Sequence, residues 1–110
     1  MKLTQADKRW IKQYRRQLTK RFPGMVAQVL IYGSKARGEA GPDSDLDVLL
    51  IVHDEAADRK HEMRDIGYLL DPYGKVLPSI MAYTELEWEA RRKSGSPFRK
   101  NVERDKVRVL

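Results

Sequence analysis

Residues 31–52 read IYGSKARGEAGPDSDLDVLLIV and join two apolar stretches through a polar connection. The first stretch, residues 25–32 (MVAQVLIY), is short and rich in β-branched residues, which predicts a strand. Gly33 to Gly38 interrupt this strand and are expected to open a single helical turn. Residues 46–53 (LDVLLIVH) predict a second strand. The near-continuous apolarity of the first stretch indicates a strand that is buried on both faces.

Asp45 and Asp47 stand at the start of the second predicted strand. Alternate residues of a strand share a face, so both carboxylates project to the same side while Leu46 points into the core. Two like charges this close repel, and their oxygens are ligands that Mg²⁺ or Mn²⁺ accepts together with substrate phosphates. The pair therefore predicts a divalent-cation site. The structural alternative is that Asp45 caps a turn and Asp47 forms a salt bridge with Arg37.

Gly33 and Ser34 follow the first predicted strand directly. Glycine leaves room for a phosphate to approach the backbone, and the amides of a helical start together with the Ser34 hydroxyl favour an anion. Arg37 is expected either to hold a phosphate or to neutralise the two aspartates. Taken alone, Gly-Ser after a strand is a common turn. If the two strands pair, the bend and the acid pair lie side by side, which predicts adjacent phosphate and metal sites.

The spacing Gly33-Ser34, ten residues, then Asp45-Leu46-Asp47 resembles the signature of the DNA polymerase beta superfamily of nucleotidyltransferases. The fuller string GSKARG…SDLDVLLIV is similar to its minimal, stand-alone prokaryotic branch (MNT type), whose members are often antitoxins paired with an all-helical HEPN protein. The resemblance implies that Gly33 and Ser34 contact the β- and γ-phosphates of a nucleoside triphosphate, while Asp45 and Asp47 hold Mg²⁺ or Mn²⁺. It also implies transfer of AMP from ATP to a tyrosine of the partner protein, with pyrophosphate leaving.

The chain departs from this family pattern at one position. Active members usually carry a third carboxylate on the strand beside the acid pair, but residues 73–84 (YGKVLPSIMAYT) contain no Asp or Glu. Ser79 or Pro78 occupies the expected region, with Asp71 and Glu85 at the ends. Two functions stay open: an enzyme that acts on a partner protein or another hydroxyl acceptor, and a catalytically weak or inactive module that neutralises a helical partner by binding.

Helix signals and one further strand signal surround the central segment. Capping patterns start at Thr4, Thr84 and Ser96. The expected elements are helices over 4–21, 54–71, 84–92 and 97–104 and a strand over 75–83, which Pro78 places at an edge or a bulge. This order predicts an α/β (α+β) fold, a small mixed sheet with helices packed on it, in one domain over 1–110. The family resemblance implies the nucleotidyltransferase (DNA polymerase beta-like) version of that fold.

The net charge of +6 is unevenly distributed. Residues 1–24 hold eight Lys and Arg against Asp7 alone, residues 25–90 hold six basic against thirteen acidic residues, and residues 91–110 hold eight basic against two acidic residues. Such a basic frame suits a nucleotide, a nucleic acid or an acidic protein, and is equally typical of solvated helix faces. A nucleic-acid-binding protein is the less favoured class, because no groove-reading motif or cluster of stacking aromatics is present.

Composition excludes several other classes. The chain has no cysteine, so disulfides and thiolate metal sites are excluded, and a cytoplasmic location is expected. No apolar run approaches the roughly 20 residues of a membrane span, so no membrane partner is expected. A second copy of the chain stays open as a partner.

Overall fold

The computed structural model describes residues 1–41 and 43–110, and the strands of this part form one mixed sheet. Its order is β3-β2-β1-β4, with β1 at Val26–Tyr32, β2 at Leu46–Val52, β3 at Pro78–Thr84 and β4 at Val107–Arg108. β2 runs antiparallel to β1 and parallel to β3, and β4 pairs antiparallel with the other side of β1. The predicted mixed sheet is confirmed, and β3 lies at an edge with Pro78 as its first residue, where no ladder amide is needed.

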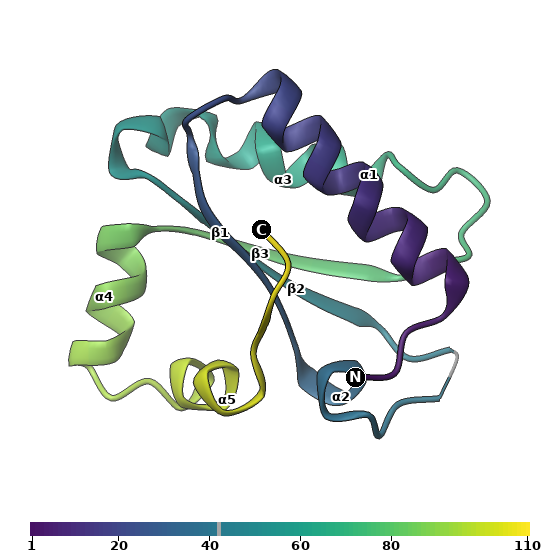
Figure 1. Cartoon of the computed structure of the whole chain (residues 1–110). Helices are drawn as coiled ribbons and strands as arrows, with labels where there is room; N and C mark the ends of the chain where they lie inside the picture. The colour runs from purple at the N-terminus through teal and green to yellow at the C-terminus, as the bar shows by residue number, and fades with distance from the viewer. Residues whose placement is uncertain (42) are drawn as a thin grey trace.

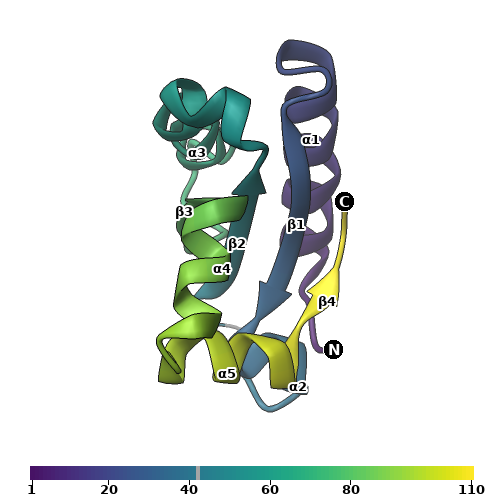
Figure 2. The same cartoon turned by 90° about the vertical axis from the view of Figure 1, so that its left-hand side faces the viewer.

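Helices cover both faces of the sheet (Figures 1 and 2). α1 (Gln5–Arg21) and α3 (Lys60–Tyr68) pack on one face, and α4 (Glu85–Lys93) and α5 (Pro97–Asp105) lie on the other. The short α2 (Gly33–Arg37) follows β1 at the end of the sheet near α5. None of the helices among the described residues has the length and apolar character that a membrane crossing requires.

The central strand β2 determines where the site lies. All of its residues are buried except Asp47, which is half-buried. Leu46, Val48 and Leu50 belong to the core under α1 and α3. Leu49 and Ile51 belong to the second core, with Trp88 of α4 and Val102 of α5. Because side chains alternate along a strand, Asp47 faces the α4–α5 side of the sheet.

The predicted helix starts are confirmed. Thr4 accepts a hydrogen bond from the Asp7 amide at 3.0 Å and Asp7 returns one to the Thr4 amide at 3.0 Å, which completes a capping box for α1. Thr84 and Glu87 form the same motif at α4. Ser96 caps α5, with Pro97 in its first turn.

Two predicted elements differ from the structure by more than one residue at an end. The helix expected over 54–71 is a 3₁₀ segment, η1 (Asp54–Arg59), followed by α3, with Ala56 outside helical geometry at the kink (φ −103°, ψ 15°). At the first residue of η1, the Asp54 carboxylate accepts the Leu86 amide of α4 at 3.0 Å. The strand expected over 75–83 begins only at Pro78, because Asp71 accepts the Val76 amide at 2.6 Å and holds the preceding residues in a loop.

Candidate functional site

The bend after β1 lies directly against the acid pair at the start of β2. In the antiparallel register Tyr32 is opposite Asp47, and Gly33 follows Tyr32 directly. A Cβ atom added to Gly33 would lie 2.2 Å from Asp47 Oδ2, and Gly33 has a φ of +78°. Only glycine fits this position without displacing the carboxylate or straining the backbone. The structure thus brings together the bend and the acid pair that the sequence placed on separate strands.

Replacing Gly33 by alanine tests this contact, and Gly38 provides a matched control. Both glycines have nearly the same left-handed backbone, φ +78° and +79°, but nothing lies within 4 Å of a Cβ added to Gly38. Gly38→Ala is therefore expected to lose about 1–2 kcal/mol of unfolding free energy from the backbone alone. Gly33→Ala is expected to lose roughly 1–3 kcal/mol more, because its methyl group collides with Asp47. Urea unfolding measures both losses, and equal losses would show that the Gly33–Asp47 contact is absent.

Among the described residues, no cation is in direct contact with either of the two aspartates. Asp45 is exposed and Asp47 is half-buried. Within residues 1–41 and 43–110, neither carboxylate makes an ion pair or a side-chain hydrogen bond. Burial raises the pKa of Asp47, the charge of Asp45 raises it further, and Arg37 lowers it. Two unpaired carboxylates on one face fit a divalent cation that is completed by phosphate oxygens.

Arg37 is not the salt-bridge partner of Asp47. Its guanidinium donates through Nε to Glu39 Oε2 at 3.0 Å and through Nη1 to Asp105 Oδ2 of α5 at 2.7 Å. The structural alternative, an Asp47–Arg37 salt bridge, is therefore wrong for this structure. Arg37 still lies near enough for its charge to lower the pKa of Asp47. Its assignment as a phosphate ligand stays a prediction. To bind a phosphate with two nitrogens, the Arg37 guanidinium would have to release Glu39 or Asp105.

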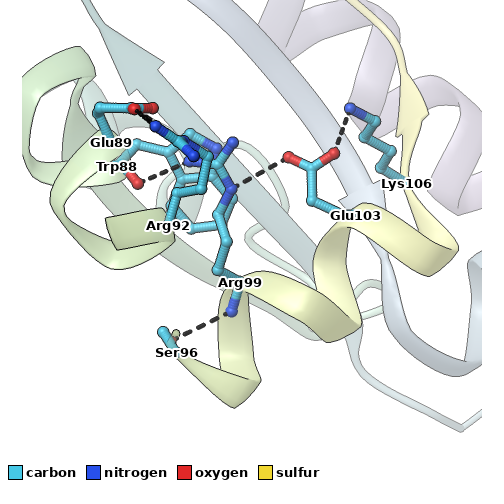
Figure 3. Close-up of polar contacts among 7 residues, drawn as sticks. All are labelled: Trp88, Glu89, Arg92, Ser96, Arg99, Glu103 and Lys106. Carbon is cyan, nitrogen blue, oxygen red and sulfur yellow. Dashed lines mark hydrogen bonds and ion pairs between the residues drawn. The ribbon is translucent and has the colours of Figure 1, made fainter. Parts of the chain in front are cut away.

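A network between α4 and α5 holds the helix that carries Asp105 (Figure 3). The Arg99 guanidinium lies over the Trp88 ring at 4.6 Å, donates to the Trp88 carbonyl oxygen at 2.7 Å and donates to Glu103 Oε1 at 3.1 Å. Glu103 also pairs with Lys106 Nζ at 2.6 Å. α5 is thus fastened to α4 and presents Asp105 to Arg37.

Lys35, at the centre of the bend, has a role that sequence reasoning missed. Its side chain is buried and its Nζ lies 2.6 Å from Asp7 Oδ2 at the start of α1. The adjoining backbone is tied to the same region, since the Lys2 amide donates to the Lys35 carbonyl oxygen at 2.8 Å. The sequence showed Asp7 as a helix cap, but nothing local identified a partner 28 residues away. Lys35 therefore anchors the bend to the core and does not face the acid pair.

The position opposite Asp47 on β3 holds no acid. The parallel register pairs Asp47 with Ser79, which confirms that the predicted third strand places a serine there. Asp71 turns away, with its carboxylate accepting the amides of Tyr73 and Val76 at 3.2 and 2.6 Å. Glu85 lies beyond the far end of β3 and contacts His53 Nδ1 at 2.8 Å. In the part of the chain that the structure describes, no group of three acidic or histidine side chains is placed to share a metal ion.

Tyr32 lies near Asp47 and is another residue that sequence reasoning did not single out. It is half-buried, and its ring meets the Phe98 ring edge-on with centroids 5.6 Å apart. Burial raises the pKa of Tyr32 to about 12, and the Asp47 charge contributes to the rise. The phenol therefore stays protonated at neutral pH and adds a neutral hydroxyl near the acid pair.

Comparisons with known proteins match most of the chain. A family model described as "Nucleotidyltransferase domain" matches residues 11–109. A relative from Methanocaldococcus jannaschii, named "Putative protein adenylyltransferase", is 30% identical over 96 residues, which are 87% of this chain and 90% of that protein.

Two solved structures show the same fold, each with a TM-score of 0.55. One is a "putative nucleotidyltransferase" from Sulfolobus solfataricus, 20% identical, with 91% of this chain matching 76% of that one. The other is described as "the toxin-antitoxin with AMP-PNP", 13% identical, with 90% of this chain matching 72% of that one.

Proposed function

The chain belongs to the nucleotidyltransferase domain family, and we propose on that basis that it transfers a nucleotidyl group, AMP from ATP, to a hydroxyl group of a partner protein. The observation that carries the proposal is the contact between Gly33 and Asp47, where a Cβ would lie 2.2 Å from the carboxylate. It supports a phosphate-binding bend and a cation-binding acid pair that act on one triphosphate. The M. jannaschii relative, named as a protein adenylyltransferase, supports the choice of AMP and of a protein acceptor.

Each site residue has a distinct role in this proposal. Gly33 and Ser34 would hold the terminal phosphates, since the first amides of α2 have no partner within the helix. Asp45 and Asp47 would hold Mg²⁺ or Mn²⁺, and Arg37 is the basic residue nearest to assist. A bound divalent cation would offset the negative charge that develops on the phosphates during transfer. The acceptor oxygen bonds to the α-phosphorus, the bond from that phosphorus to the bridging oxygen breaks, and pyrophosphate leaves with the hydroxyl proton released to solvent or a base.

We propose further that the acceptor is the toxin of a toxin-antitoxin pair, a helical protein of the HEPN type, with this chain as the antitoxin. The fold neighbour described as a toxin-antitoxin with AMP-PNP supports a protein partner together with an adenine nucleotide. The resemblance of GSKARG…SDLDVLLIV to the minimal branch supports the helical partner.

Labelled ATP tests the reaction. Purified chain is incubated with Mg²⁺ and the protein encoded by an adjacent gene, using ATP labelled at either the α- or the γ-phosphate. Label from the α position, and not from the γ position, is expected on the acceptor. Transfer of γ label would indicate a kinase-like reaction, and absence of both, with a stable complex, would contradict the transferase.

The vacant third acid position supports a second candidate, a binding module that neutralises its partner without efficient catalysis. Ser79 lies opposite Asp47, where a third carboxylate would reach the same cation. For this module, the affinity for the partner is expected to be the same with Asp45→Asn and Asp47→Asn as with the unchanged chain. For the enzyme, the same two variants are expected to bind the partner as before but no longer to transfer the α-label from ATP.

Placing an acid at Ser79 tests how much the missing carboxylate limits the rate. Ser79→Asp is expected to raise α-label transfer by about tenfold or more at limiting Mg²⁺, because a third ligand strengthens cation binding. Ser79→Asn is the matched control, because asparagine has the size of aspartate but carries no charge. It is expected to leave the rate of label transfer near that of the unchanged chain. Equal rates for the two variants would show that Ser79 does not face the cation.

A further inference from the structure

The solvent-facing side of α1 is basic along its whole length. Its exposed cationic residues are Lys8, Arg9, Lys12, Arg15, Arg16, Lys20 and Arg21, here called the α1 basic face. The one acidic residue of α1, Asp7, is buried against Lys35. No carboxylate of α1 therefore lies among these cations.

On the other described helices, several cations are paired with acids, whereas Arg91, Lys93 and Lys100 form no ion pair there. Arg59 pairs with Glu62, Arg92 with Glu89, and Arg99 with Glu103. By contrast, no residue of the α1 basic face has a carboxylate within 4.0 Å in the described ranges 1–41 and 43–110. Like charges three or four residues apart on a helix destabilise it. This repulsion makes the α1 basic face a candidate site for an anionic ligand.

The central part of the face borders a shallow hollow of about 480 Å³, lined by Lys12, Arg15, Arg16, Thr19, Lys20 and Leu110. From Lys12 to Lys20 the helix advances roughly 12 Å. Over that length one nucleic-acid strand presents about three or four phosphates. The spacing of the four cations therefore suits a run of consecutive phosphates.

The composition of the face argues against a protein or a membrane as its ligand. The exposed residues of α1 are all polar, because Trp10, Tyr14 and Leu18 are buried against the sheet. Protein interfaces have an apolar core, and a helix that lies on a membrane inserts its apolar side. Contacts to nucleic-acid phosphates need only cations and polar donors, and carry no sequence preference.

We propose that the α1 basic face binds the phosphate backbone of a nucleic acid. α1 packs on the face of the sheet opposite to Asp47, so this surface is separate from the nucleotidyltransferase site (Figures 1 and 2). Binding of nucleic acid at this face does not depend on the proposed transfer reaction. The sequence alone made nucleic acid the less favoured ligand, and the structure changes that preference.

Fluorescence anisotropy with a labelled 20-nucleotide RNA and a 20-base-pair DNA, over a range of salt concentrations, tests the proposal. The test variant replaces Lys12, Arg15, Arg16 and Lys20 by glutamine. The matched control replaces four other exposed cations that form no ion pair in the described structure, Lys75, Arg91, Lys93 and Lys100, so both variants lose the same charge. The test variant is expected to bind at least about 100-fold more weakly, with a salt slope smaller by about three. The control is expected to remain within about threefold of the unchanged chain.

Several results would overturn the proposal. Equal losses in the test and control variants would mean that net charge alone, and not the α1 basic face, attracts the polyanion. Absence of binding to both RNA and DNA at 50 mM salt would exclude a nucleic-acid ligand. Binding to polyglutamate or to phosphatidylserine vesicles without binding to either nucleic acid would assign the face to an acidic protein or a membrane. A circular dichroism melt of each variant verifies that it is folded, and folding of the test variant is expected because its substitutions are exposed and relieve repulsion.

Discussion

Asp47→Asn is expected to reduce transfer of α-label from ATP by on the order of 100-fold or more and, in metal-free buffer, to raise the melting temperature. Transfer falls because the amide removes a negative ligand of the cation. Stability rises because burial and the Asp45 charge raise the pKa of Asp47, so the ionised carboxylate is less favourable in the folded chain than in the unfolded one. A transfer assay and a thermal melt on the same preparation measure both effects.

The pH dependence of this stability difference has a definite sign. A carboxyl whose folded pKa is raised destabilises the fold above that pKa and ceases to do so once it is protonated in both states. The advantage of Asp47→Asn is therefore expected at neutral pH and should shrink as the pH falls through the raised pKa toward the ordinary value of 3.8.

Asp58→Asn is the control for Asp47→Asn. Asp58 is exposed and makes no ion pair within the described residues, so its replacement should change neither transfer nor stability appreciably. Adding Mg²⁺ is expected to stabilise the unchanged chain and the Asp58 variant but not Asp47→Asn. A fall in melting temperature for Asp47→Asn in metal-free buffer would identify Asp47 as a structural residue and contradict the proposed site.

Lys35→Met is expected to lower the unfolding free energy by about 3–5 kcal/mol. The substitution replaces the aliphatic part of the lysine side chain as far as Cε but leaves the Asp7 carboxylate buried without its cation, Lys35 Nζ, which lies 2.6 Å away in the structure. One oxygen of Asp7, Oδ1, is buried with no hydrogen-bond partner, so the pair is the main compensation for that charge. Urea unfolding with a fixed m-value measures the loss.

A double-mutant cycle isolates the ion pair. Asp7→Asn retains an oxygen for the Thr4 amide while removing the charge, so Lys35→Met combined with Asp7→Asn should be more stable than Lys35→Met alone. Lys75→Met, at an exposed lysine, is the control and should change stability by less than about 0.5 kcal/mol. Additive effects of the two substitutions would mean that Lys35 and Asp7 do not interact.

The predictions that succeeded depend on residues close together in the chain. A capping box needs four consecutive residues, so Thr4 with Asp7 and Thr84 with Glu87 identified helix starts correctly. The absence of an acid between residues 73 and 84 is likewise a property of one segment, and the register confirmed Ser79 opposite Asp47. The proximity of Gly33 to Asp47 also follows from chain order, because β1 and β2 are consecutive strands and consecutive strands commonly lie side by side in a sheet.

By itself, then, the sequence determined the strand–bend–strand unit, the helix starts and the serine at the third acid position, because periodicity and capping act within a few residues. Only the tertiary structure decided the Lys35–Asp7 pair, the Arg37–Asp105 contact and the addition of β4 to the edge of β1. These contacts join residues 28 or more positions apart. Which distant side chains meet depends on how whole surfaces pack, and no local pattern records that choice.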